Sequence, residues 1–140
     1  MTDLKKPEHH ELLSEANRAF AWARALDALR RDQWGNGGEG AMTKLARSFP
    51  TLRHADGVEP WDVARFVRWS DGPQLTSGMV YALRFVLQVW NPDTDWATHA
   101  VELGVDGSHL KPFNVVAAFS CWDEAHRAAF FAWVAAPFHP

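Results

Sequence analysis

Hydrophobic residues recur every three or four positions along most of this chain, the spacing that keeps them on one side of an α-helix. The clearest segment spans residues 74–90, where four polar-capable residues stand 4, 3 and 4 positions apart in an otherwise apolar run: Ser77, Tyr81, Arg84 and Gln88. A helix gathers these four into one narrow stripe, whereas a strand would scatter them over both faces. The pattern predicts a largely buried helix over about 74–90, ended by Asn91-Pro92 because the residue before proline avoids helical geometry.

The rest of the chain also favours helices. The pattern predicts an amphipathic helix over 7–34 with Pro7 in its first turn, and shorter helices over 41–48, 60–69, 113–121 and 123–135. Asp123 or Ser120 can cap the last of them. We expect an all-α fold, a compact single-domain bundle of about five helices around the central helix. The one domain spans 1–140, with residues 1–6 disordered and 92–112 an irregular segment that holds at most a short strand at 101–103.

Aromatic residues are the unusual part of the composition, with 8 Trp, 9 Phe and 1 Tyr in 140 residues. Each ring can bury about 150–250 Å², so a few rings dominate packing. We expect these C-terminal residues to face inward: Val116, Phe119, Trp122, Phe130 and Trp133. Every buried indole N–H needs an acceptor, so some tryptophans should lie at the edge of the core or at an interface. The candidate partner-binding residues are Trp34, Trp61, Trp96 and Phe138.

Charge and cysteine content narrow the function classes. The net charge of −3 is too small to steer the chain toward a charged partner, and nucleic-acid binding through the mildly basic region 24–53 is the weakest alternative. Cys121 is the single cysteine, so an intrachain disulfide is excluded, and we expect it to be buried and structural. No apolar run approaches the length of a membrane span. We expect a cytoplasmic chain without a membrane partner.

No residue set has the spacing of a known catalytic or metal site. Gly35, Gly37 and Gly40 have the G-x-G-x-x-G spacing, but a helix precedes them where a dinucleotide site needs a strand. We read 35–40 as a loop between helices. His9 and Glu11 have the H-x-E spacing of some metal sites, but residues two apart on a helix point away from each other. His99 and His109 lack the spacing of a helical zinc site, so we predict no metal, no cofactor and no catalytic residue.

The leading hypothesis is therefore a non-enzymatic helical module, a small regulator, adaptor or inhibitor, that binds another protein or a second copy of itself through aromatic residues. The alternative is a small-ligand-binding protein or an enzyme with a pocket between helices near Arg84. In that reading an arginine in an apolar helix needs a partner, either an aspartate or an anionic ligand. The candidate ligand-binding residues are Arg84, Tyr81, Gln88 and His126.

Overall fold

The computed structural model of the chain describes residues 9–140, with side chains from Ser14 onward. The expected disorder of residues 1–6 and the position of Pro7 lie outside this range. All regular secondary structure in the described range is helical. The elements are α1 (His9–Trp34), α2 (Gly38–Ser48), the 3-10 helix η2 (Pro50–Leu52), α3 (Val63–Ser70), α4 (Ser77–Trp90), α5 (Trp96–Glu102), α6 (Val115–Cys121) and α7 (Glu124–Ala135).

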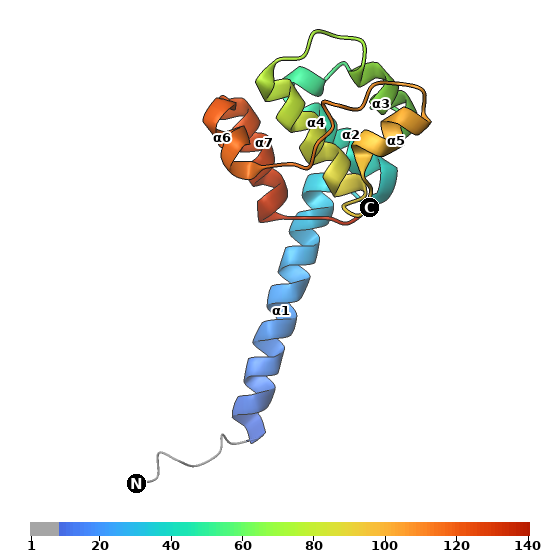
Figure 1. Cartoon of the computed structure of the whole chain (residues 1–140). Helices are drawn as coiled ribbons and strands as arrows, with labels where there is room; N and C mark the ends of the chain where they lie inside the picture. The colour runs from blue at the N-terminus through green and yellow to red at the C-terminus, as the bar shows by residue number, and fades with distance from the viewer. Residues whose placement is uncertain (1–8) are drawn as a thin grey trace.

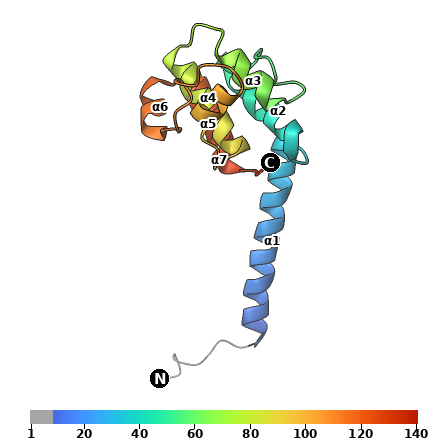
Figure 2. The same ribbon diagram turned by 45° about the vertical axis from the view of Figure 1, so that its right-hand side comes forward.

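The first helix projects out of the rest of the molecule. Figures 1 and 2 show α2 to α7 gathered into a head, from which α1 extends as a long rod. We call residues 9–29 of α1 the arm and residues 34–140 the head. Every side chain from Ser14 to Leu29 is exposed, and only at Trp34 does the helix enter the core. The expected helix over 7–34 is confirmed over 9–34, but its apolar side is not packed in the core.

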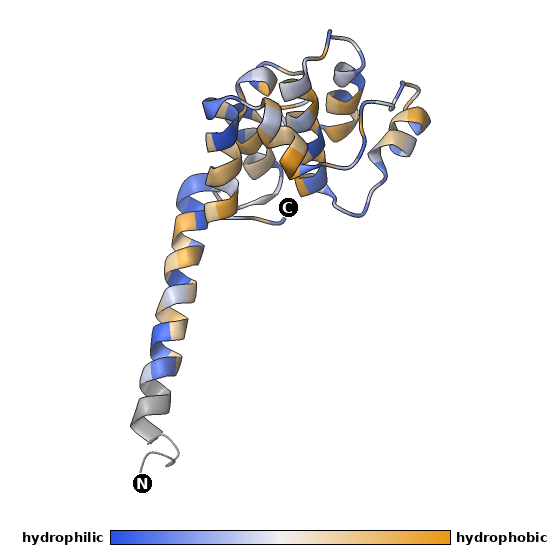
Figure 3. Cartoon of the chain, turned by 60° about the vertical axis from the view of Figure 1, so that its left-hand side comes forward, coloured by the Kyte–Doolittle hydropathy of each residue, from blue (hydrophilic) through white to orange (hydrophobic). Residues whose placement is uncertain are grey.

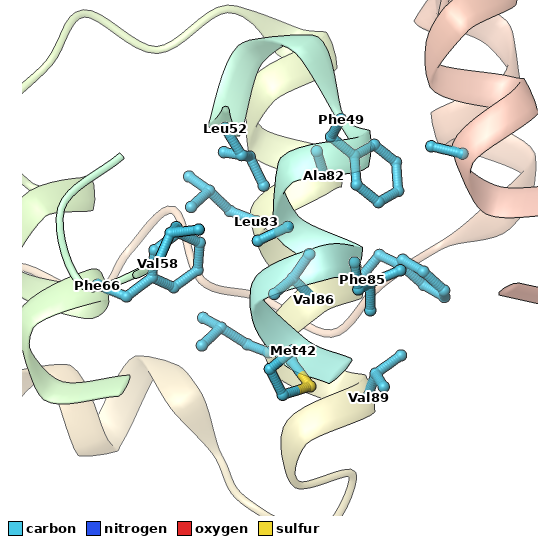
Figure 4. Close-up of a cluster of buried hydrophobic side chains, with 14 of the residues drawn as sticks. Met42, Phe49, Leu52, Val58, Phe66, Ala82, Leu83, Phe85, Val86 and Val89 are labelled. Carbon is cyan, nitrogen blue, oxygen red and sulfur yellow. The ribbon is translucent and has the colours of Figure 1, made fainter. Parts of the chain in front are cut away.

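Helix α4 supplies much of the core of the head. Seven of its residues are buried, and it packs against α2, η2 and α6, while α2 also packs against α1 and α7. Figure 4 shows Phe49 and Leu52 lying beside α4, with Met42 near its C-terminal half. Thr76 caps the helix by accepting a hydrogen bond from the Met79 backbone N–H. The predicted helix over about 74–90 is therefore present from residue 77 to 90.

Side-chain caps explain where most of the short helices begin. Asp62 caps α3, Asp95 caps α5, Asn114 caps α6 and Asp123 caps α7, each accepting a backbone N–H from three residues further on. The prediction that Asp123 caps the last helix is confirmed. The prediction that Pro60 opens a helix is wrong, because α3 begins only at Val63, after its Asp62 cap.

Five further expectations need correction. The irregular segment contains α5, so the possible strand at 101–103 is wrong, and α2 already begins at Gly38 within the predicted glycine loop. Val116 was expected inside but is 78% exposed. Cys121 is exposed rather than buried. The described range holds seven α-helices where about five were expected.

Candidate functional site

The arm carries an uncovered apolar surface. At 3.6 residues per turn, positions separated by three and four residues form one stripe, here Ala16, Ala19, Ala23 and Leu26. Phe20 and Trp22 flank this stripe on either side, and their side chains are 63% and 71% exposed. Leu29 continues the side that carries Trp22. We call these seven residues the arm surface, and Figure 3 shows hydrophobic turns along α1.

The local sequence explains why the arm is helical without packing on the head. Alanine, leucine and arginine are strong helix formers, and they make up most of residues 18–31. Asp27 pairs with Arg30 at 3.2 Å and with Arg31 at 3.6 Å, one turn further along the helix. The Arg24 guanidinium lies 4.9 Å from the centre of the Phe20 ring. Such contacts add a few tenths of a kcal/mol each, and tertiary packing normally supplies the rest.

The base of the arm is fixed to the head. The Trp34 indole N–H donates a 2.7 Å hydrogen bond to the Ala136 carbonyl, and its ring lies 5.4 Å from that of Phe138. Gly35, at φ 76°, ends the helix in the left-handed conformation that glycine adopts at little cost, and its N–H bonds to the Arg31 carbonyl. Anchored in this way, the arm points away from the head.

Charge is distributed unevenly along the arm sequence. The segment from Glu8 to Asn17 holds three glutamates and neither lysine nor arginine. The segment from Arg18 to Arg31 holds four arginines and a single acidic residue. The segment 8–17 is therefore acidic, and the segment 18–31, which runs past the arm to the last turns before Trp34, is basic.

A second exposed apolar group lies on the head. It consists of Val115, Val116, Phe131 and Val134, on α6 and α7. The Phe131 ring lies 5.4 Å from the half-buried ring of Phe119. We call these four residues the α6–α7 patch.

The four predicted partner-binding residues lie elsewhere than expected. Trp34, Trp61, Trp96 and Phe138 are all buried in the core and cannot form an exposed aromatic patch. Sequence reasoning expected these rings at the surface because periodicity does not distinguish a core aromatic residue from an exposed one. Trp22, Phe20 and Phe131 are the exposed rings that it missed. One available signal was that the apolar side of residues 16–26 is mostly alanine, which offers little surface for anchoring a long helix to a core.

Two of the four predicted ligand-binding residues meet at one cavity. Arg84 and Gln88 line a surface pocket of about 440 Å³ between the end of α4, the turn before α5 and residues 110–113. Trp96 and Phe113 add aromatic walls. The lining also includes Asp93, Asp95 and Lys111, and the Asp95 carboxylate accepts hydrogen bonds from the Thr98 N–H and hydroxyl.

Arg84 is held in place by neutral partners. Its Nε–H donates to the His109 carbonyl at 2.9 Å, and its guanidinium carbon lies 5.1 Å from the centre of the Tyr81 ring. Among residues 14–140, no carboxylate lies within salt-bridge distance of Arg84. The aspartate partner that the sequence allowed is therefore not found in that range.

His109 packs on the end of α3. Its Nε2 lies 2.8 Å from the Ser70 hydroxyl oxygen, and this hydroxyl donates its own hydrogen to the Val67 carbonyl. His109 Nε2 must therefore act as the donor. Burial lowers the pKa of His109, against the opposing effect of the Asp71 and Asp106 carboxylates.

His126 lies apart from the Arg84 pocket. Its Nδ1 is 2.7 Å from Asp123 Oδ1, and its Nε2 is 2.9 Å from Thr51 Oγ1, so a carboxylate, an imidazole and a hydroxyl stand in line. The His126 backbone N–H also bonds to Asp123 and, with the ring, lowers the pKa of that carboxyl. Nucleophilic enzymes use this order of groups. Here, however, His126 is only 5% exposed and the Arg84 pocket lies elsewhere, so the three residues join η2 to α7.

The geometry gives little support to nucleic-acid binding, metal binding or membrane insertion. In the basic region, Asp27 pairs with Arg30 and Arg31, and Glu59 pairs with Arg47, so acidic groups interrupt the positive face. Among the side chains that the structure describes, no three metal-ligating groups cluster. In the same part of the chain, no helix combines the length and apolarity needed to cross a bilayer.

The arm surface and the Arg84 pocket are thus the two candidate sites in the described part of the chain. Comparisons of the chain with models of protein families, with curated proteins and with solved structures find no match.

Proposed function

We propose that this chain is a non-enzymatic protein-binding module whose arm surface packs against a helix of a partner polypeptide. The observation that carries the proposal is the exposure of Phe20, Trp22, Leu26 and Leu29 on one projecting helix. Tryptophan is among the residues that contribute most to interface energies, and an exposed one on a rigid helix loses little entropy on binding. An apolar helix face laid against another helix is a recurring mode of recognition.

A photo-crosslinking residue placed on the arm tests this proposal in the source cell. Benzoylphenylalanine replaces Trp22 in one variant and Ala21 in the other, because Ala21 faces away from the stripe on the same turn. We expect adducts of defined mass from position 22 and few or none from position 21. Equal adducts from both positions, or none from either, would contradict the proposal.

The head then serves as the scaffold that holds the arm. We propose that it is a compact bundle organised around α4, and that the protein works in the cytoplasm. An exposed thiol such as that of Cys121 stays reduced in that compartment. Modification of Cys121 by a membrane-permeable thiol reagent in intact cells tests the second point, and a thiol found fully oxidised would contradict it.

The Arg84 pocket supports small-ligand binding as a second candidate function. Its lining combines two basic residues, Arg84 and Lys111, with two acidic residues, Asp93 and Asp95, of which Asp95 also caps α5. A ligand that carries both charge signs fits such a lining better than a simple anion. Free amino acids and peptide ends have this character.

Nuclear magnetic resonance can test the second candidate with a matched pair of probes. Glutamate and glutarate differ only in the amino group, so glutamate should shift the Trp96 indole and Gln88 amide signals more strongly. Arg84→Gln should remove the shifts, and Arg65→Gln should keep them because Arg65 pairs with Asp56 outside the pocket. Equal shifts with both probes, or none, would contradict the candidate.

A further inference from the structure

The arm surface has too little apolar area to bind a broad, flat partner surface. Its narrow shape suits a second helix of the same width. The stripe of alanines allows two helix backbones to approach closely, and the flanking rings of Phe20 and Trp22 can then close over the sides. These two rings leave on the order of 250 Å² exposed in each copy. Two copies would double that area, and the alanines and leucines would bring the total near the low end of stable interfaces, about 1,200 Å².

We infer that the partner of the arm is a second copy of this chain, whose arm runs antiparallel to the first with its centre near Ala19. This inference rests on the proposed function, since it names the occupant of the same surface. Its first support is charge. Antiparallel pairing places residues 9–17 of each copy, which hold two glutamates and neither lysine nor arginine, opposite residues 22–30 of the other, which hold two arginines and one aspartate. Parallel pairing would place like charges together, which is unfavourable.

The length of the arm gives the second support. The arm spans residues 9–29, so its midpoint is Ala19, a member of the stripe. With the pair centred between Ala19 and Phe20, His9 of one copy lies opposite Arg30 of the other, just before the head begins. Each arm is then covered over its whole length without a collision between heads. A parallel pair would instead bring both heads to the same end.

The antiparallel register makes a specific contact. Ala16 of one arm lies opposite Ala23 of the other, because both lie on the stripe and are placed about evenly around Ala19. A parallel pair would set Ala16 against Ala16 and Ala23 against Ala23. Single cysteines at these two positions therefore distinguish the arrangements.

Disulfide trapping tests the arrangement in the full chain. The background variant carries Cys121→Ser, because the native thiol is exposed. We expect Ala16→Cys and Ala23→Cys chains, once mixed and mildly oxidised, to form the 16–23 heterodimer far faster than either homodimer. Preferential 16–16 and 23–23 disulfides would overturn the antiparallel pairing.

Light scattering and sedimentation of the full chain test self-association itself. We expect a dimer with a Kd on the order of micromolar, which added salt weakens because unlike charges face each other. Leu26→Glu should raise the Kd at least about tenfold. Ala28→Glu, on the side of the helix away from the arm surface, and Phe131→Glu, on the α6–α7 patch, should leave it unchanged. Dissociation by Phe131→Glu but not by Leu26→Glu would overturn the inference.

A chain that stays monomeric at about 100 μM would also overturn the inference. The proposed function is judged separately by the adducts at position 22. Adducts to a different protein, combined with a monomeric purified chain, would refute self-pairing and leave the binding module standing. The absence of both adducts and dimer would refute the two together.

Discussion

The Trp34 indole N–H bonds to the Ala136 carbonyl across 102 positions of the sequence, and so joins the base of the arm to the end of α7. Trp34→Phe keeps an aromatic ring but leaves this buried carbonyl without its donor. We expect a loss of about 1–3 kcal/mol in the free energy of unfolding, measured by urea denaturation. A loss below about 0.5 kcal/mol would show that water replaces the indole at no cost.

Trp22 and Trp122 are the same residue type in opposite environments, exposed on the arm and buried in the head. Trp122→Ala should cost about 3–5 kcal/mol, because its ring packs on Phe49 and Phe113 and its N–H bonds to Gly78. Trp22→Ala should change stability by less than about 0.5 kcal/mol when unfolding is followed at about 0.05 μM, well below the expected Kd, where the chain is mostly monomeric. A cost above about 1.5 kcal/mol at Trp22 would mean that the arm packs on the head.

The Thr51 hydroxyl is the partner of the His126 Nε2 atom. Thr51→Val removes the hydroxyl while keeping the shape of the side chain, so we expect a loss of about 1–2 kcal/mol from an unpaired buried nitrogen. Thr51→Ser keeps the hydroxyl and serves as the control, with a smaller loss. The difference between the two variants in thermal or urea unfolding measures the hydrogen bond, and a valine variant as stable as the serine variant would contradict this prediction.

Stability should fall on mild acidification partly because of His109. Burial lowers the pKa of His109, so the unfolded chain takes up a proton at a higher pH than the folded chain does. The contribution of neutral His109 to the free energy of unfolding is fully present above the ordinary histidine pKa of about 6.5. It is lost as the pH falls below that value toward the lower pKa of the folded state. We expect the wild type to lose more stability than His109→Gln between about pH 7.5 and about pH 5.5 in urea titrations. Parallel pH profiles for the two proteins would contradict the prediction.

The sequence pattern was sufficient to predict the all-helical fold class and the helices with the clearest hydrophobic period. Residues 77–90 are apolar on all but one narrow side, which only a helix buried on most faces can explain. Helix α5 escaped prediction because its seven residues show no clear apolar period, and Gly104 and Gly107 follow it closely. Its start was readable after the fact, since Asp95 stands three residues before Thr98 and accepts its backbone N–H.

The candidate sites were harder to predict for a different reason. Periodicity identified the apolar side of residues 16–26 but could not tell what covers it, because that depends on how much surface the other helices offer. The same limit placed Trp61 and Trp96 at an interface when they belong to the core. The polar stripe on α4 was more informative, because two of its residues, Arg84 and Gln88, line one pocket. Nothing in the pattern indicated that His126 lies apart from that pocket.

The projecting arm also governs how the protein moves through solution. A helix of 26 residues is about 39 Å long, comparable with the diameter of a small head, so a single copy is markedly elongated. The frictional coefficient of one copy equals that of a larger sphere, so even a monomer will elute early from a gel-filtration column. Only a measurement of absolute mass can therefore count the copies of this chain in a particle.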